Sequence, residues 1–182
     1  MPSNHDGMKK MEAGLELYNL GRYDEAEKLF QQALYGQEKV LSKNHADTLD
    51  SQQGLGIMLY RQGKLKEAEE IFQRVVYGQE KTLGKDHTDN SASKYWLGIT
   101  LDKLDKLKEA EEILQQAVYG LEKTLSKDHA DTLNSKHGLG ITLYKLGKLK
   151  EAEEIFQQAV YGREKTLGKD HADTLSISMG LE

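Results

Sequence analysis

The stretch HADTLDSQQGLGIMLYRQGKLKEAEEIFQRVVYGQEKTLGKD, residues 45–86, returns almost unchanged as residues 129–170, with 33 of 42 positions identical. Residues 87–128 follow the same frame, and so do most of the residues before 45. Self-similarity at a fixed period of this length indicates that one supersecondary unit has been duplicated. Each unit of such an array packs mainly against its neighbours, and repeat arrays of this kind usually bind other molecules.

Two amphipathic helices are predicted in each repeat. In the first, helix A, apolar or small residues from Leu49 to Tyr60 fall at spacings of three, four and seven, which is typical of one helical face. Its start is expected at Asp47 or Thr48, whose side chains can accept hydrogen bonds from free backbone N–H groups. The second, helix B, is expected from Leu65 to Leu83.

Neither helix can bury its apolar stripe alone, so successive antiparallel hairpins are expected to stack. The predicted fold class is therefore all-α, an α-solenoid of antiparallel helix hairpins that winds into a superhelix. We expect residues 1–7 to form a leader and residues 8–182 to form a single array. Its repeats are placed at about 8–44, 45–86, 87–128 and 129–170, with a partial repeat at 171–182.

Two residue ladders run along helix B. Glycine recurs at Gly36, Gly78, Gly120 and Gly162, although a glycine inside a helix costs about 1 kcal/mol relative to alanine. Its return indicates a close helix contact or a bend, or else simple copying of one ancestral glycine. Tyrosine recurs one residue earlier in each repeat, and we expect these rings to pack between repeats, because buried aromatic rings contribute strongly to packing.

Composition excludes several classes of partner. The net charge is -5, and the acidic and basic residues are interspersed, so no basic stripe exists for nucleic acid. No apolar run of about 18 residues exists, and the first residues lack the basic and apolar regions of a signal peptide. The sequence therefore predicts a cytoplasmic protein with no membrane association. The absence of cysteine excludes disulfides and cysteine nucleophiles.

The sequence shows no recognisable active site. The sequence contains no P-loop, G-x-S-x-G or H-E-x-x-H pattern, so we predict no enzyme activity, no catalytic residue and no cofactor. Histidine and aspartate recur two positions apart at the start of each helix A, which could suggest a metal pair. Equivalent residues of stacked hairpins should lie on the order of 20 Å apart, so we assign these histidines to the helix start rather than to a metal: His45, His87, His129 and His171.

The repeat resembles the tetratricopeptide repeat. Leu55-Gly56, Leu59-Tyr60, Gly63, Ala68 and Phe72 follow the L-G-x-x-Y…G…A-x-x-x-F spacing of that family, with leucine at the first aromatic position and tyrosine one residue later. The family's familiar repeat has 34 residues and ends helix B with proline, whereas Glu80 stands at that position here. The 42-residue period is similar to the units of kinesin light chains and of repeat sensors in nucleotide-binding signalling proteins. This resemblance implies a right-handed superhelix.

In those relatives, partners lie along a concave surface lined by helix A. The resemblance therefore implies a non-catalytic scaffold that binds a protein or a peptide on this surface. Carried over position by position, the implied partner-binding residues are Leu15, Tyr18, Asn19, Gln53, Ile57, Tyr60, Arg61, Tyr95, Trp96, Ile99, Asp102, Lys103, His137, Ile141, Tyr144 and Lys145.

The third repeat breaks the pattern on helix A. Ser91 replaces the usual leucine, Trp96 the usual glycine, Asp102 the usual tyrosine and Asp105 the usual loop glycine. Trp96, the only tryptophan, lies beside Tyr95, and both residue types are enriched among binding hot spots. We therefore consider Trp96 either an anchor for a partner or a product of drift after duplication.

The ends of the array suggest an alternative function. Terminal repeats normally carry a polar cap, and no such cap is evident in the sequence. Either the sequence is a fragment of a longer array, or its free ends stack head to tail between molecules, a heterologous contact that can build fibres. The second reading gives the alternative to the scaffold, a structural repeat that self-associates through its ends. A metal-dependent or enzymatic role through histidine and glutamate is the weakest of the three hypotheses.

Overall fold

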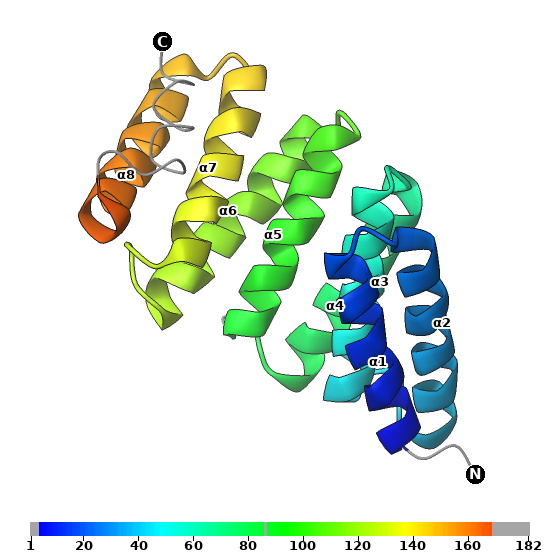
Figure 1. Ribbon diagram of the computed structural model, residues 1–182. Helices are drawn as coiled ribbons and strands as arrows, with labels where there is room; N and C mark the ends of the chain where they lie inside the picture. The colour runs from blue at the N-terminus through cyan, green and yellow to red at the C-terminus, as the bar shows by residue number, and fades with distance from the viewer. Residues whose placement is uncertain (1–3, 86, 169–182) are drawn as a thin grey trace. The chain divides into compact units, whose positions relative to one another are not determined.

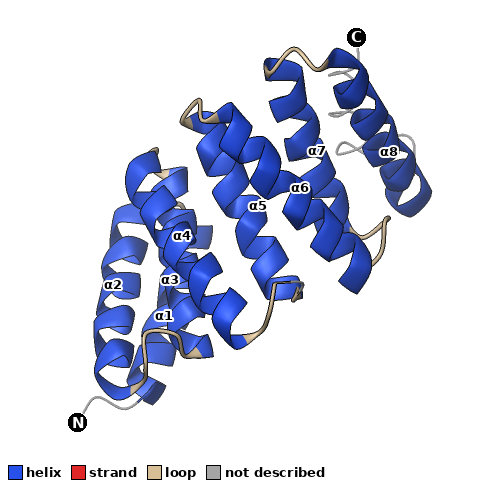
Figure 2. Cartoon of the chain, turned by 180° about the vertical axis from the view of Figure 1, so that it is seen from behind, coloured by secondary structure: helices blue, strands red, loops and turns tan. Residues whose placement is uncertain are grey.

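The computed structural model describes residues 4–85 and 87–168 and contains α-helices but no strands in those ranges (Figures 1 and 2). Helix A of successive repeats corresponds to the odd-numbered helices and helix B to the even-numbered ones. The partial repeat predicted at 171–182 lies outside the described residues. The helices are α1 Asn4–Asn19, α2 Tyr23–Val40, α3 Ala46–Arg61, α4 Leu65–Thr82, α5 Thr88–Lys103, α6 Leu107–Thr124, α7 Ala130–Lys145 and α8 Leu149–Leu167.

The chain divides into two units, which we call the N-terminal unit (Met1–Gly84) and the C-terminal unit (Lys85–Glu182). In each unit, helix A packs against helix B of its own hairpin, and helix B packs against helix A of the next. These contacts join α1 to α4 in the N-terminal unit and α5 to α8 in the C-terminal unit. The predicted fold class, an all-α solenoid of helix hairpins, is confirmed. Helix α1 begins at Asn4, inside the segment predicted to be a leader.

Histidine, not aspartate or threonine, caps helix A. The Nδ1 atom of His45 accepts a hydrogen bond from the backbone N–H of Asp47 at 3.3 Å. The same bond recurs at His87 with 3.3 Å and at His129 with 3.2 Å. The predicted cap at Asp47 or Thr48 was therefore wrong, because both residues lie within the first turn of the helix. The assignment of the histidines to the helix start is confirmed for these three repeats.

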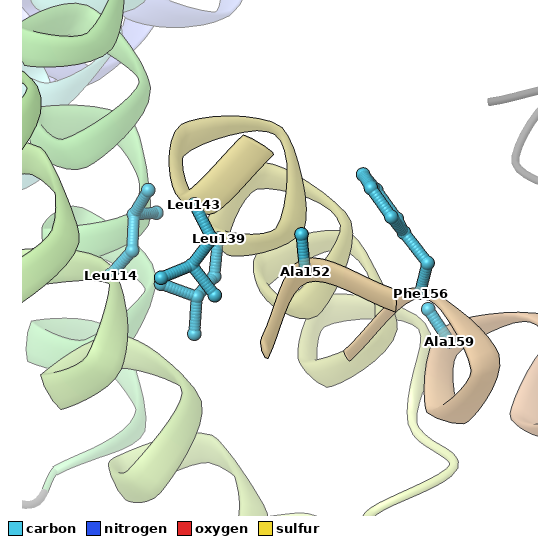
Figure 3. Close-up of a cluster of buried hydrophobic side chains, with 6 residues drawn as sticks. All are labelled: Leu114, Leu139, Leu143, Ala152, Phe156 and Ala159. Atoms are coloured by element: carbon cyan, nitrogen blue, oxygen red, sulfur yellow. The ribbon is translucent and has the colours of Figure 1, made fainter. Parts of the chain in front are cut away.

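A large side chain of helix B fills the space beside the glycines of helix A. Phe30 is 1% exposed and lies against Gly14 of its own hairpin and Gly54 of the next. A Cβ atom added at Gly54 would overlap the Phe30 ring, and one added at Gly14 would lie 3.0 Å from it. In the C-terminal unit, Phe156 belongs to the same kind of cluster (Figure 3). Glycine on helix A therefore sets how closely the helices approach.

The glycines of helix B differ from one another in what surrounds them. A Cβ atom added at Gly78 would lie 2.6 Å from Leu49, and one added at Gly162 would lie 2.5 Å from Leu133. At Gly36 the same atom would meet nothing within 4 Å, because Gly7 stands where the second repeat has Leu49. Close packing explains the glycine in the second and fourth repeats but not in the first.

This difference predicts opposite effects of one substitution. Gly36→Ala should raise the free energy of unfolding by about 0.5–1 kcal/mol, since alanine favours the helix and nothing opposes its methyl group. Gly162→Ala should lower it, because overpacking costs about 1–3 kcal/mol and outweighs that gain. Urea denaturation followed by circular dichroism measures both variants. Equal shifts of the same sign would contradict the packing explanation.

A buried polar pair joins α2 and α3, and its counterpart in the C-terminal unit is incomplete. Ser51 Oγ and Gln37 Oε1 lie 2.6 Å apart, and both side chains are fully buried. At the equivalent contact of α6 with α7, Leu121 stands in place of Gln37. The buried hydroxyl of Ser135 consequently has no hydrogen-bond partner.

Alanine substitutions should therefore separate the two serines. Ser51→Ala leaves the Gln37 amide oxygen buried and unpaired, which costs about 1–3 kcal/mol of unfolding free energy. Ser135→Ala removes an unpaired hydroxyl, so it should be neutral or stabilising by up to about 1 kcal/mol. The test compares urea midpoints of the two variants with that of the unmodified chain, and equal losses at both sites would contradict it.

Candidate functional site

The predicted partner-binding residues lie on helix A in both units. The N-terminal helix-A face consists of residues from α1 and α3, which contact each other directly. None of its members is buried, and Leu15 is 48% exposed. This face therefore offers accessible aliphatic and aromatic side chains beside polar ones. It comprises Leu15, Tyr18, Asn19, Gln53, Ile57, Tyr60 and Arg61.

The C-terminal helix-A face consists of residues from α5 and α7, which also contact each other. None of its members is buried in the core, but exposure differs between the two helices. Tyr144 is 63% exposed and Ile141 36%, whereas Tyr95 and Ile99 are half-buried against the cluster of Leu114 and its neighbours. The face comprises Tyr95, Trp96, Ile99, Asp102, Lys103, His137, Ile141, Tyr144 and Lys145.

Asp102 links the two helices of the C-terminal helix-A face. Its carboxylate forms an ion pair with Lys145 and accepts a hydrogen bond from Thr142 Oγ1 at 3.0 Å. The Asp102 side chain is only 11% exposed. The aspartate that replaces tyrosine in the third repeat therefore joins successive hairpins. The sequence analysis did not include Thr142 among the candidate residues. It could have been noticed as a polar residue at the position where the second repeat has the apolar Met58.

Trp96 and Tyr95 are neighbours on α5 and contact each other. Their ring centroids lie 5.5 Å apart with an interplanar angle of 63°, an edge-on arrangement. This is one of the preferred geometries for aromatic pairs, because the positive ring edge meets the negative face. Both side chains are half-buried. The role of Trp96 as an anchor for a partner remains a prediction.

His137 is a titratable residue of this face, and its pKa is lowered. It lies on α7, half-buried, with its ring centroid 5.9 Å from that of Phe156 on α8. Burial lowers the pKa of His137 below its usual value, and the positive charge of Arg163 lowers this pKa further. The neutral imidazole is therefore the form that the folded C-terminal unit favours.

This shift predicts acid sensitivity. A histidine whose pKa is lower in the folded state than in the unfolded state stabilises the fold above the unfolded pKa of about 6.5. That contribution is lost as the pH falls below this value, because the unfolded chain then binds the proton more readily. His137→Gln, which copies Gln53, should reduce the loss of unfolding free energy between pH 7.5 and 5. Urea titrations at several pH values test this, and identical pH profiles for both chains would contradict it.

The tyrosine ladder of helix B lies on another surface. Tyr35, Tyr77, Tyr119 and Tyr161 are 66%, 58%, 63% and 68% exposed. The prediction that they pack between repeats was wrong. In three of them, a lysine four residues later lies over the ring, with Nζ to centroid distances of 4.0 Å for Lys39, 4.6 Å for Lys81 and 5.9 Å for Lys123. At these three tyrosines a lysine ammonium group of the same helix therefore lies where a contact with the next repeat was expected.

Two further observations concern function. Within residues 4–85 and 87–168, no three histidine or acidic side chains gather in a group that could hold a metal ion. None of the helices in these ranges has the length and apolar character needed to cross a bilayer. His171, which the sequence analysis assigned to the start of a fifth helix A, lies outside the described residues.

Stacked hairpins with accessible side chains on helix A define a repeat protein of the helical solenoid class. The tetratricopeptide repeat family model matches residues 12–81, 55–123, 89–165 and 128–181. The chain belongs to the tetratricopeptide repeat family. This fold generally mediates protein–protein interaction, and such scaffolds are generally non-catalytic.

Solved structures agree with this assignment. A kinesin light chain-like protein from Podosopora anserina, with nearly identical TPR-like repeats, is 30% identical with a TM-score of 0.83, covering 97% of this chain and 84% of that one. A second crystal structure of such a protein from Podosopora anserina is 31% identical with a TM-score of 0.82, and the match covers 93% of this chain and 80% of that one. BtubC from P. vanneervenii shares the fold at 18% identity and a TM-score of 0.81, covering 92% and 67%. No curated protein matches the chain significantly.

Proposed function

We propose that the chain is a non-catalytic scaffold that binds a protein or a peptide on its helix-A faces, the concave surface of the family. The observation that supports this most directly is the exposure of Ile141 and Tyr144 beside half-buried Tyr95 and Ile99 on two adjoining helices. Tyrosine is one of the residue types enriched among the hot spots that dominate binding energy in protein interfaces. We place the protein in the cytoplasm as part of this proposal, and the absence of cysteine is compatible with that location.

The exposed helix-B tyrosines provide a matched control for the test. A displayed peptide library is selected against the purified full chain, and the affinity of the selected peptides is measured by calorimetry. Each selected peptide should lose affinity at least tenfold through Tyr60→Ala if it occupies the N-terminal helix-A face, or through Tyr144→Ala if it occupies the C-terminal one, the loss expected for a hot spot of about 1.4 kcal/mol or more. Tyr161→Ala and Tyr77→Ala, which remove exposed tyrosines from helix B, should change the affinity less than twofold.

The controls also define the opposite result. Binding lost through the helix-B substitutions and kept by the helix-A substitutions would move the partner site to the tyrosine ladder. Circular dichroism of all four variants confirms that each remains folded.

A further inference from the structure

Successive hairpins within one unit meet through three positions of helix A. In α3, Ser51 bonds to Gln37 of α2, Gly54 lies against Phe30, and Met58 is 1% exposed. The serine and the glycine therefore both face the preceding hairpin. Each of the three positions carries a small or apolar residue.

The equivalent positions of α7 are Ser135, Gly138 and Thr142, and they show similar burial and contacts. Ser135 and Thr142 are fully buried, and Thr142 bonds to Asp102 of the preceding hairpin. A Cβ atom added at Gly138 would lie 3.3 Å from Ile99 and 3.6 Å from Leu114. Stacking in both units therefore uses a small uncharged residue, a glycine and a buried uncharged residue, in that order.

Helix α1 carries charged residues at all three of these positions. Counting back 42 residues from α3, Ser51 corresponds to Lys9, Gly54 to Glu12 and Met58 to Glu16. All three charged side chains are exposed. They define the outer face of α1, the side on which a preceding hairpin would lie.

A hairpin stacked on the outer face of α1 would meet two barriers. It would bury three charged groups, and each buried charge without a partner costs several kcal/mol. It would also meet the Glu12 side chain where the α2–α3 contact has no room for even a Cβ atom, since one at Gly54 overlaps Phe30. Neither barrier depends on what else is joined to the chain.

We infer that the outer face of α1 is a polar cap that rejects a further hairpin of this type, whether from an added repeat or from a second copy of the chain. It differs from the sequence-based expectation that the ends of the array carry no evident cap. It also opposes head-to-tail self-association through α1. The inference is independent of the proposed partner site.

An extended chain tests the cap. A copy of residues 45–86 is joined before residue 3, which keeps the 42-residue spacing, and the extension is made with two versions of α1. One version is native, and the other carries Lys9→Ser, Glu12→Gly and Glu16→Met, which restore the residues of α3. Each version is compared with its own unextended chain, so that the intrinsic effects of the three substitutions cancel.

Hydrogen exchange and urea denaturation provide the readouts. With the native face, the amides of the added hairpin should exchange as in an unfolded segment, and the urea midpoint should not move. With the restored face, these amides should be protected at least tenfold and the midpoint should rise. Protection on the native face would overturn the inference. So would a lack of protection on both faces, because the three charged residues would then not decide stacking.

Discussion

Replacing Lys136 with glutamate should lower the free energy of unfolding of the C-terminal unit by about 3–5 kcal/mol. Lys136 on α7 places its Nζ atom 2.7 Å from Glu122 Oε1 on α6. Its side chain is only 4% exposed, and that of Glu122 is 29% exposed. The substitution would place a second carboxylate at the buried position of Lys136, beside a carboxylate that has lost its partner. Buried like charges are costly because the interior screens them weakly.

The second repeat supplies the control. Gln52 occupies the position of Lys136 there and is also buried, so Lys136→Gln keeps a residue that this contact tolerates. Lys136→Gln should lower the free energy of unfolding clearly less than Lys136→Glu, because the partly exposed Glu122 carboxylate can be hydrated by solvent. The exchanged pair, Glu122→Lys with Lys136→Glu, should recover part of the loss. Urea midpoints of the four chains measure this, and equal losses for glutamine and glutamate would show that charge does not matter at this contact.

The period and the apolar spacing were sufficient to predict the fold. Helix B was expected from Leu65, where α4 begins, and helix A was expected within one or two residues of Ala46. The identity of the cap was missed, because His45 bonds through Nδ1 to a backbone N–H, a role more common for aspartate, serine or threonine. For locating the N-cap of helix A, the position within the repeat was therefore more informative than the general preference for aspartate, serine or threonine.

The contacts between hairpins were much harder to predict. Asp102 and Lys145 both belonged to the predicted binding residues, yet they pair with each other across 43 positions. Their pairing depends on which helix faces meet, and a single sequence does not give that. The tyrosine ladder shows the reverse error, since aromatic character indicated burial while Tyr35 and its equivalents face solvent. Copied residues do not reveal which copies are constrained, as Gly36 and Gly78 demonstrate.

Phe30→Ala should destabilise the N-terminal unit by about 3–5 kcal/mol, the range for removing a buried aromatic ring. The cost of such a cavity depends on whether neighbouring side chains can move into it. Here two of the nearest neighbours are Gly14 and Gly54, which have no side chains to move. Phe30→Leu, which copies Leu114 of the third repeat, should cost less, and Tyr35→Ala at an exposed site should cost little.

The same geometry predicts that two harmful substitutions partly cancel. Gly54→Ala alone should destabilise, because its Cβ atom overlaps the Phe30 ring. In the background of Phe30→Ala the ring is absent, so the added methyl group enters the cavity and also favours the helix. The double variant should therefore be more stable than the sum of the single effects by at least about 1 kcal/mol, the size of coupling seen between residues in contact. Additive losses would mean that the Phe30 ring does not impose glycine at position 54.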